Sequence, residues 1–177
     1  MKPFWLTPFP DATPRPDVSI QGNLARPAGA LAVRYELRGS MPEVLLPPPA
    51  RASGRKHNLW EETCLELFVA PQDSASYWEF NLSPSGDWQV YRFSAYRQDR
   101  QEETAFTSLP FAVQSRPDSF SLDLELDLGR IIHAGRPIQV GATAVIRDRN
   151  SHVTYWALTH CGAQADLHLR PSFTLEL

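Results

Sequence analysis

The sequence is poor in several residue types and patterns that would point to a particular class of protein. It has two cysteines, Cys64 and Cys161, in 177 residues. Two distant cysteines make no disulfide framework, so we expect reduced thiols and a cytoplasmic protein. Prolines interrupt residues 1–16, which contain no apolar run long enough for a signal peptide or a membrane helix. The sequence therefore predicts neither export nor insertion into a membrane.

Basic blocks and helical periodicity are also missing. The chain carries 17 basic and 20 acidic residues, for a net charge of −3. Without a basic patch, nucleic acid is not an expected partner. No stretch keeps a 3.6-residue apolar period over three turns, and we find no internal repeat. Length and pattern predict one domain over residues 1–177, without long helices.

Alternating apolar and polar residues fill most of the chain. The alternation is clearest over 31–38, 120–127 and 137–147, and turn residues separate the runs. Such short, regularly spaced strands predict an all-β fold, an antiparallel β-sandwich of about ten strands with jelly-roll or immunoglobulin-like architecture. Residues 1–16 are expected to form a proline-rich extended arm that packs against this body.

The most informative stretch is 59–97, which reads as a three-stranded meander. Neighbouring side chains on a strand face opposite ways, so Glu66, Glu79 and Asn81 should share the face opposite the leucines. Two adjacent carboxylates repel each other, and Arg92 could supply a compensating cation. We therefore expect Trp88 and Arg92 to line the carboxylate side. Tyr91 and Phe93 should then face the core.

Tryptophan gives a second signal, because an exposed indole is a stacking surface for a sugar ring. Trp60 ends a polar loop and is a candidate for this role, whereas Trp78 on the apolar face is expected in the core. The polar groups also have a simpler interpretation as a solvated sheet face balanced by cross-strand pairs. A glycosidase with paired carboxylates is disfavoured, because the sequence predicts a flat sheet without a deep cleft.

Four residues near the C-terminus have side chains that suit zinc or copper: His160, Cys161, Asp166 and His168. Their spacing matches no strong metal signature, so structural roles are favoured over a metal site. His160 and Cys161 would also point to opposite faces of a strand, which argues against a Cys–His catalytic pair. We expect no metal and no other cofactor.

Three motifs together resemble those of bacterial DOMON-like domains, which are similar to family-nine carbohydrate-binding modules. They are Leu-Trp-x-x-Thr-Cys-Leu-Glu-Leu-Phe at 59–68, Tyr-x-Glu-Phe-Asn-x-Ser-Pro-Ser-Gly-x-Trp-x-x-Tyr-x-Phe-x-x-Tyr-Arg at 77–97, and Ala-Asp-Leu-His at 165–168. The resemblance implies a non-catalytic, ligand-binding β-sandwich. It also implies that Trp60 and a second tryptophan, for which Trp156 is the candidate, would enclose a sugar.

Three functional hypotheses follow from these observations. The first is a module that binds a sugar or another small polar ligand through Trp60, Glu66, Glu79, Asn81, Trp88, Arg92 and Trp156. The second is a structural or protein-interaction domain without a small ligand. The third is a haem or redox domain of the DOMON type, for which the sequence offers only Met1 and Met41 as methionine ligands.

Overall fold

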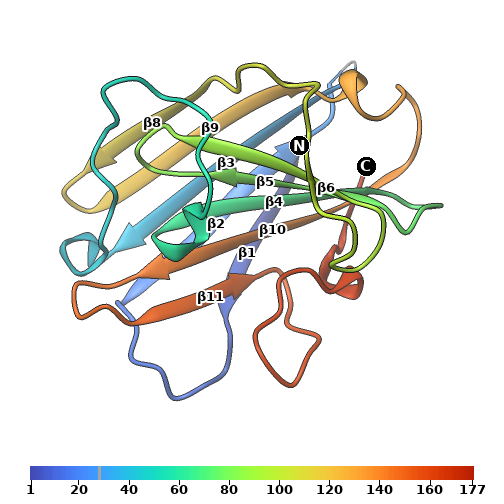
Figure 1. Ribbon diagram of the computed structural model, residues 1–177. Helices are drawn as coiled ribbons and strands as arrows, with labels where there is room; N and C mark the ends of the chain where they lie inside the picture. The colour runs from blue at the N-terminus through green and yellow to red at the C-terminus, as the bar shows by residue number, and fades with distance from the viewer. Residues whose placement is uncertain (28) are drawn as a thin grey trace.

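The computed structural model describes residues 1–27 and 29–177 and is built almost entirely from β-strands (Figure 1). All paired strands run antiparallel, which confirms the all-β, antiparallel prediction. The strands are β1 (Lys2–Pro8), β2 (Val18–Ala25), β3 (Ala30–Gly39), β4 (Cys64–Pro71), β5 (Tyr77–Leu82), β6 (Trp88–Phe93), β7 (Gln101–Glu102), β8 (Phe111–Arg116), β9 (Ser119–Asp127), β10 (Ile138–Arg147), β11 (Val153–Ala157) and β12 (Leu175–Glu176). Short 3-10 turns lie at Met41–Glu43, Leu59–Glu61, Leu128–Arg130 and Arg170–Ser172.

The strands form one continuous path, β7-β6-β5-β4-β10-β11-β1-β2-β3-β9-β8, and β12 pairs with β10. β1 joins the two halves of this path. Its first residues pair with β2, and Thr7 and Pro8 pair with β11. The proline-containing segment that was expected to be an extended arm thus contributes a strand to the sheet. Prolines at the ends of β1 suit this position, because they cost no central ladder hydrogen bond.

The sheet curls so that its two halves bury apolar side chains in one core. β3 supplies Leu31, Val33 and Leu37, and β4 supplies Leu65 and Leu67 to the same cluster. A hydrogen bond crosses this core, because the Tyr35 hydroxyl donates to the backbone oxygen of Glu66 at 2.6 Å. Alternation in the sequence therefore identified the inward side chains of these strands correctly.

The outward sides of the two halves differ, and we give each a name. The open face comprises the outward side chains of β1, β2, β3 and β9, represented by Trp5, Gln21, Arg34, Glu36 and Asp123. The covered face comprises those of β4, β5, β6 and β10, represented by Glu66, Phe68, Tyr77, Glu79 and Phe93.

A second apolar cluster lies on the covered face. It joins Phe68 and Tyr77 to Leu167 and Phe173 from the C-terminal segment 158–177. Phe173 stacks on Phe68 with ring centroids 5.3 Å apart. Gly141 makes room for this contact, because a Cβ there would lie 2.7 Å from the Phe173 ring. The C-terminal segment is therefore packed onto the sheet.

No helix in the described residues has the length and apolar character needed to cross a membrane.

Candidate functional site

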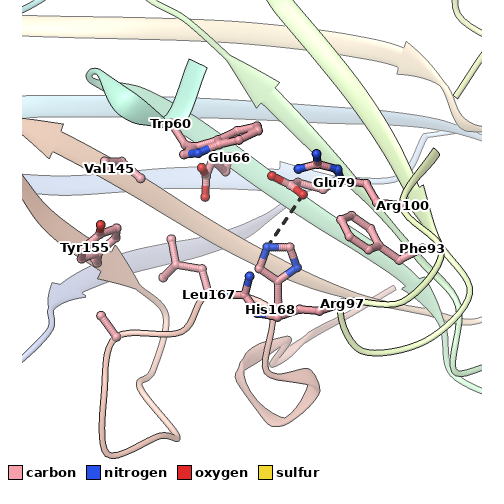
Figure 2. Close-up of a pocket in the computed structure, with 11 residues that line it drawn as sticks. Trp60, Glu66, Glu79, Phe93, Arg97, Arg100, Val145, Tyr155, Leu167 and His168 are labelled. Carbon is pink, nitrogen blue, oxygen red and sulfur yellow. Dashed lines mark ion pairs between the residues drawn. The ribbon is translucent and has the colours of Figure 1, made fainter. Parts of the chain in front are cut away.

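A pocket of about 490 Å³ opens between the covered face and the segments that overlie it (Figure 2). Its floor comes from β4, β5 and β10, and its walls come from the turn at Leu59–Glu61, the loop between β6 and β7, β11 and the C-terminal segment. The residues that line it are Trp60, Glu66, Glu79, Phe93, Arg97, Arg100, Val145, Tyr155, Ala165, Leu167 and His168. A cavity of this size is in the range of small-molecule sites.

Two carboxyl groups, Glu66 on β4 and Glu79 on β5, form the polar part of the floor. The register pairs Glu66 with Asn81 and Phe68 with Glu79, which places the two acids on one face as predicted. Thr143 Oγ1 donates to Glu66 Oε2 at 3.1 Å, and Asn81 Nδ2 donates to Glu79 Oε1 at 2.9 Å. Within the described residues, the other oxygen of each group forms no hydrogen bond. Each acid therefore keeps an acceptor for a ligand.

Both acids are buried rather than exposed on an outer surface, with 3% of Glu66 and 5% of Glu79 accessible. Burial disfavours the charged form, and together with the nearby charge of Glu79 it raises the pKa of Glu66 to about 8. Burial also raises the pKa of Glu79, although Asn81 and the positive charges of Arg100 and Arg97 oppose this shift. The floor therefore binds protons more tightly than ordinary glutamates do.

His168 lies beside Glu79, with Nε2 3.8 Å from Glu79 Oε2 (dashed in Figure 2). Its Nδ1 is 2.8 Å from the Tyr77 hydroxyl, and its ring meets Phe68 and Phe93 edge to face. Burial, followed by the positive charge of Arg97, lowers the pKa of His168 to about 4. The imidazole is therefore neutral at physiological pH and does not balance the acids.

Two arginines from the loop between β6 and β7 reach the pocket. Arg97 Nη2 is 2.9 Å from Asp166 Oδ1, and Asp166 also accepts hydrogen bonds from the Tyr96 hydroxyl and the His168 backbone N–H. Although burial opposes them, these bonds lower the pKa of Asp166. The Arg100 guanidinium lies 5.0 Å from the Tyr91 ring centroid. The arginines thus join the loop and the C-terminal segment around the cavity.

Trp60 forms a wall of the pocket, and Figure 2 shows its indole over the Glu66 carboxylate. It lies in the 3-10 turn Leu59–Glu61, which begins after Asn58 in the left-handed conformation. The indole meets Tyr91 edge to face at 6.0 Å, and Arg100 lies 5.8 Å from its centroid. The predicted position of Trp60 near the carboxylates therefore agrees with the structure.

Four other candidates do not line the pocket: Asn81, Trp88, Arg92 and Trp156. Asn81 is fully buried and acts only through its hydrogen bond to Glu79. Glu79 pairs with Tyr91, so the predicted facing of β6 was wrong. Tyr91 and Phe93 belong to the covered face, whereas Trp88 is buried in the main core, where the Arg55 guanidinium stacks on it at 4.4 Å. The turn after β5 sets this register, because it pairs Leu82 with Trp88. Trp88 therefore faces the same apolar side of the sheet as Leu82.

Arg92 cannot compensate the acids, because it pairs with Trp78 on the opposite parity and donates to Gln101 at 3.0 Å. Trp156 packs in the main core, and its indole Nε1 donates to Thr154 Oγ1 at 3.0 Å. The expected pair of tryptophans around one cavity is thus absent, and Tyr155 lines the pocket in its neighbour's place.

Sequence reasoning missed Arg97, Arg100, Leu167 and His168 as pocket residues. Arg97, Leu167 and His168 do lie in the conspicuous motifs at 77–97 and 165–168. Their place beside the carboxylates depends on how the loop after β6 and the C-terminal segment fold over β4 and β5, which strand periodicity does not describe.

The four possible metal ligands near the C-terminus do not come together. Within residues 1–27 and 29–177, no group of three or more His, Cys, Asp or Glu side chains is arranged to hold a metal. Asp166 and His168 belong to the pocket, whereas His160 Nε2 lies 2.9 Å from the Thr7 backbone oxygen. Cys161 is exposed and Cys64 is buried, and both are free thiols.

The chain matches no protein-family model, and no curated protein sequence matches it significantly. Its fold does match solved structures. A Bacteroides uniformis protein inferred to bind carbohydrate is 16% identical, with a TM-score of 0.68 over 97% of this chain and 84% of its own. A family-nine carbohydrate-binding module from Caldicellulosiruptor kristjanssonii in complex with glucose is 13% identical, with a TM-score of 0.54 over 92% and 77% of the two chains.

A family-nine module from the same organism in complex with cellotriose is 12% identical, with a TM-score of 0.57 over 92% of this chain and 75% of its own. At such identities, likeness of structure concerns the fold and not the ligand. The chain thus has the fold of family-nine carbohydrate-binding modules. The pocket over Glu66 and Glu79 is the candidate functional site of this chain.

Proposed function

We propose that this protein binds a small carbohydrate, without catalysing a reaction on it, in the pocket over β4 and β5. The observation that carries the proposal is the pair of buried carboxyl groups that face one cavity beneath the Trp60 indole. Carboxyl oxygens accept hydrogen bonds from sugar hydroxyls, and the indole offers a flat apolar face for the ring carbons.

The size and composition of the cavity support this function. About 490 Å³ accommodates a monosaccharide or a short oligosaccharide, and aromatic walls with a few polar groups are typical of ligand sites. The structural neighbours described above include modules with bound glucose and cellotriose, which favours the same ligand class. In this proposal the curled sheet is a β-sandwich of the family-nine kind, with the ligand on one outer face.

A binding role fits the carboxylates better than glycosidase chemistry does. A glycosidase needs two acids that flank the scissile bond. Glu66 and Glu79 instead rise from adjacent strands on one floor, and Glu79 is held by Asn81. Such an arrangement suits fixed hydrogen bonds to a ligand.

Calorimetric titration with glucose, cellobiose and cellotriose tests the proposal. We expect saturable binding to the wild-type protein and a loss of about fivefold or more in affinity for Trp60→Ala, because one aromatic contact contributes about 1 kcal/mol. Trp5→Ala is the matched control, since Trp5 is 63% exposed on the open face. No heat with any sugar, or loss of binding in the Trp5 variant alone, would contradict the proposal.

A further inference from the structure

The acids of the pocket floor lack a cationic partner within the protein. Among the described residues, no lysine or arginine nitrogen lies within 4.0 Å of a Glu66 or Glu79 carboxylate oxygen. The imidazole 3.8 Å from Glu79 is that of His168, which burial keeps neutral. Buried carboxyl groups are ordinarily paired, so this floor is unusual.

The two arginines nearby are engaged elsewhere. Arg97 is bound to Asp166 at 2.9 Å, and the Arg100 guanidinium rests on the aromatic faces of Tyr91 and Trp60. Their charges reach Glu79 through space, and the charge of Arg97 also reaches Glu66. Glu66, buried on the pocket floor among β4, β5 and β10, is the less compensated of the two.

A ligand that supplied only hydroxyl groups would satisfy hydrogen bonds at this floor but would leave the buried Glu66 carboxyl in its protonated form. A ligand that supplied a protonated amine would stabilise the ionised form, so that Glu66 releases its proton to solvent on binding, because a desolvated ion pair with a hydrogen bond is stronger than a neutral hydrogen bond. The free oxygen of Glu66 faces the cavity beneath the indole, within reach of a substituent on a sugar ring that stacks there.

We propose that the preferred ligand of this pocket is an amino sugar, whose protonated amine binds the free carboxylate oxygen of Glu66. This inference rests on the proposed function and specifies its ligand. The sugar ring packs against Trp60, and the remaining hydroxyls use Glu79 and the arginines at the rim. A sugar acid, which would use the arginines instead, is the competing ligand.

Four sugars that share one ring and differ in a single group test the inference on the wild-type protein: glucose, glucosamine, N-acetylglucosamine and glucuronate. The titrations are made at neutral pH, where the amine of glucosamine is largely protonated and Glu66 can release its proton to solvent when the amine binds. We expect glucosamine to bind roughly 10- to 100-fold more tightly than glucose, on the scale of a charge-assisted hydrogen bond. N-acetylglucosamine lacks the charge and should lose this advantage.

Glu66→Gln should remove the preference for glucosamine over glucose. Glu125→Gln is the matched control, because it makes the same change at an exposed position on β9 and should keep the preference. A melting curve establishes that each variant is folded. Should Glu66→Gln fail to fold, the four titrations on the wild-type protein still decide the question.

The outcomes separate this inference from the function on which it rests. Glucose binding with equal or weaker glucosamine binding would overturn the inference alone, and so would a preference for glucuronate. No binding of any of the four sugars would overturn the proposed function together with the inference. A glucosamine preference that survives in Glu66→Gln would also overturn the assignment to Glu66.

Discussion

The open face and the covered face are built from the same kind of strand, but the open face is accessible to solvent and the covered face is buried. On the open face, β3 alternates between buried and accessible residues, as a solvated sheet should. On the covered face, all eight residues of β4 and all six of β5 are buried. The difference comes from the C-terminal segment and the loop after β6, which lie over one face and leave the other to solvent.

This comparison shows how burial under another segment changes the chemistry of a carboxyl group. Arg34 and Asp123 form an ion pair at 3.1 Å on the open face, where both side chains are about half exposed. Solvent screens such a pair, so it contributes little to stability. Glu66, on the covered face, titrates far from its ordinary range. A polar group on an outer sheet face therefore gains unusual chemistry here only when another segment buries it.

The largest expected effect comes from removing the side chain that fixes the C-terminal segment. Phe173→Ala should lower the free energy of unfolding by about 3–5 kcal/mol, because Phe173 is buried against Phe68 and Gly141. Urea denaturation gives the value. Trp5→Ala, on the open face, should change it by less than about 0.5 kcal/mol. Equal losses of unfolding free energy in the two variants would contradict the distinction between the faces.

A second prediction concerns pH. The Glu66 carboxyl keeps its proton up to a pKa of about 8 in the folded protein, whereas its ordinary value is 4.5. Native Glu66 therefore binds more protons than unfolded Glu66 in this window. The stability that it contributes is fully present below 4.5 and is lost as the pH rises to about 8.

Glu66→Gln has no such proton, so its stability relative to the wild type should increase with pH over this window. The slope should approach about 1.4 kcal/mol per pH unit for one proton. His168, whose pKa is lowered to about 4, contributes in the opposite direction below 6.5 and is present in both proteins. Urea curves at several pH values measure the difference. A constant difference across the window would show that Glu66 titrates normally.

A smaller effect distinguishes two aspartates. Asp166→Asn should cost about 1–3 kcal/mol, because Asp166 is partly buried and binds Tyr96, Arg97 and the His168 backbone. Asp123→Asn makes the same change in the exposed pair with Arg34 and should cost less than about 1 kcal/mol. Chemical denaturation of both variants provides the comparison. A larger loss at Asp123 would contradict the ranking of the faces.

The smallest effect is expected at Arg92. This residue lies on the parity opposite the acids, where it is exposed and bonds Gln101. Arg92→Ala should leave sugar affinity within about twofold of the wild type, since distant and independent sites rarely couple. Calorimetric titration measures the affinity. A tenfold loss would restore Arg92 to the binding site and contradict the observed register.

Much of the fold could be predicted from the sequence. Alternation located β3, β9 and β10 almost to the residue, because each has one face in a common core. The same rule placed Glu66 and Glu79 together. The rule failed for β6. The strand is a nearly uninterrupted run of large side chains, so the sequence does not indicate which of them face the core. There Trp88 and Tyr91 are both buried, but in different clusters.

The rest of the site depends on contacts that periodicity does not encode. The β1 strand is rich in proline at its ends and was expected only to pack as an arm, yet it bridges the two halves of the sheet. Arg97 and His168 reach the pocket from loops far apart in the sequence. Loop paths are set by a few long-range contacts, such as Phe173 against Phe68, rather than by local pattern.

The most direct test of the account is an NMR titration that follows the indole N–H signals of the five tryptophans as sugar is added. The account predicts that the Trp60 signal shifts in a saturable way, because Trp60 lines the pocket over Glu66, while the signal of Trp5 on the open face stays fixed. A shift at Trp5 with none at Trp60 would place the ligand on the wrong face and contradict the central claim.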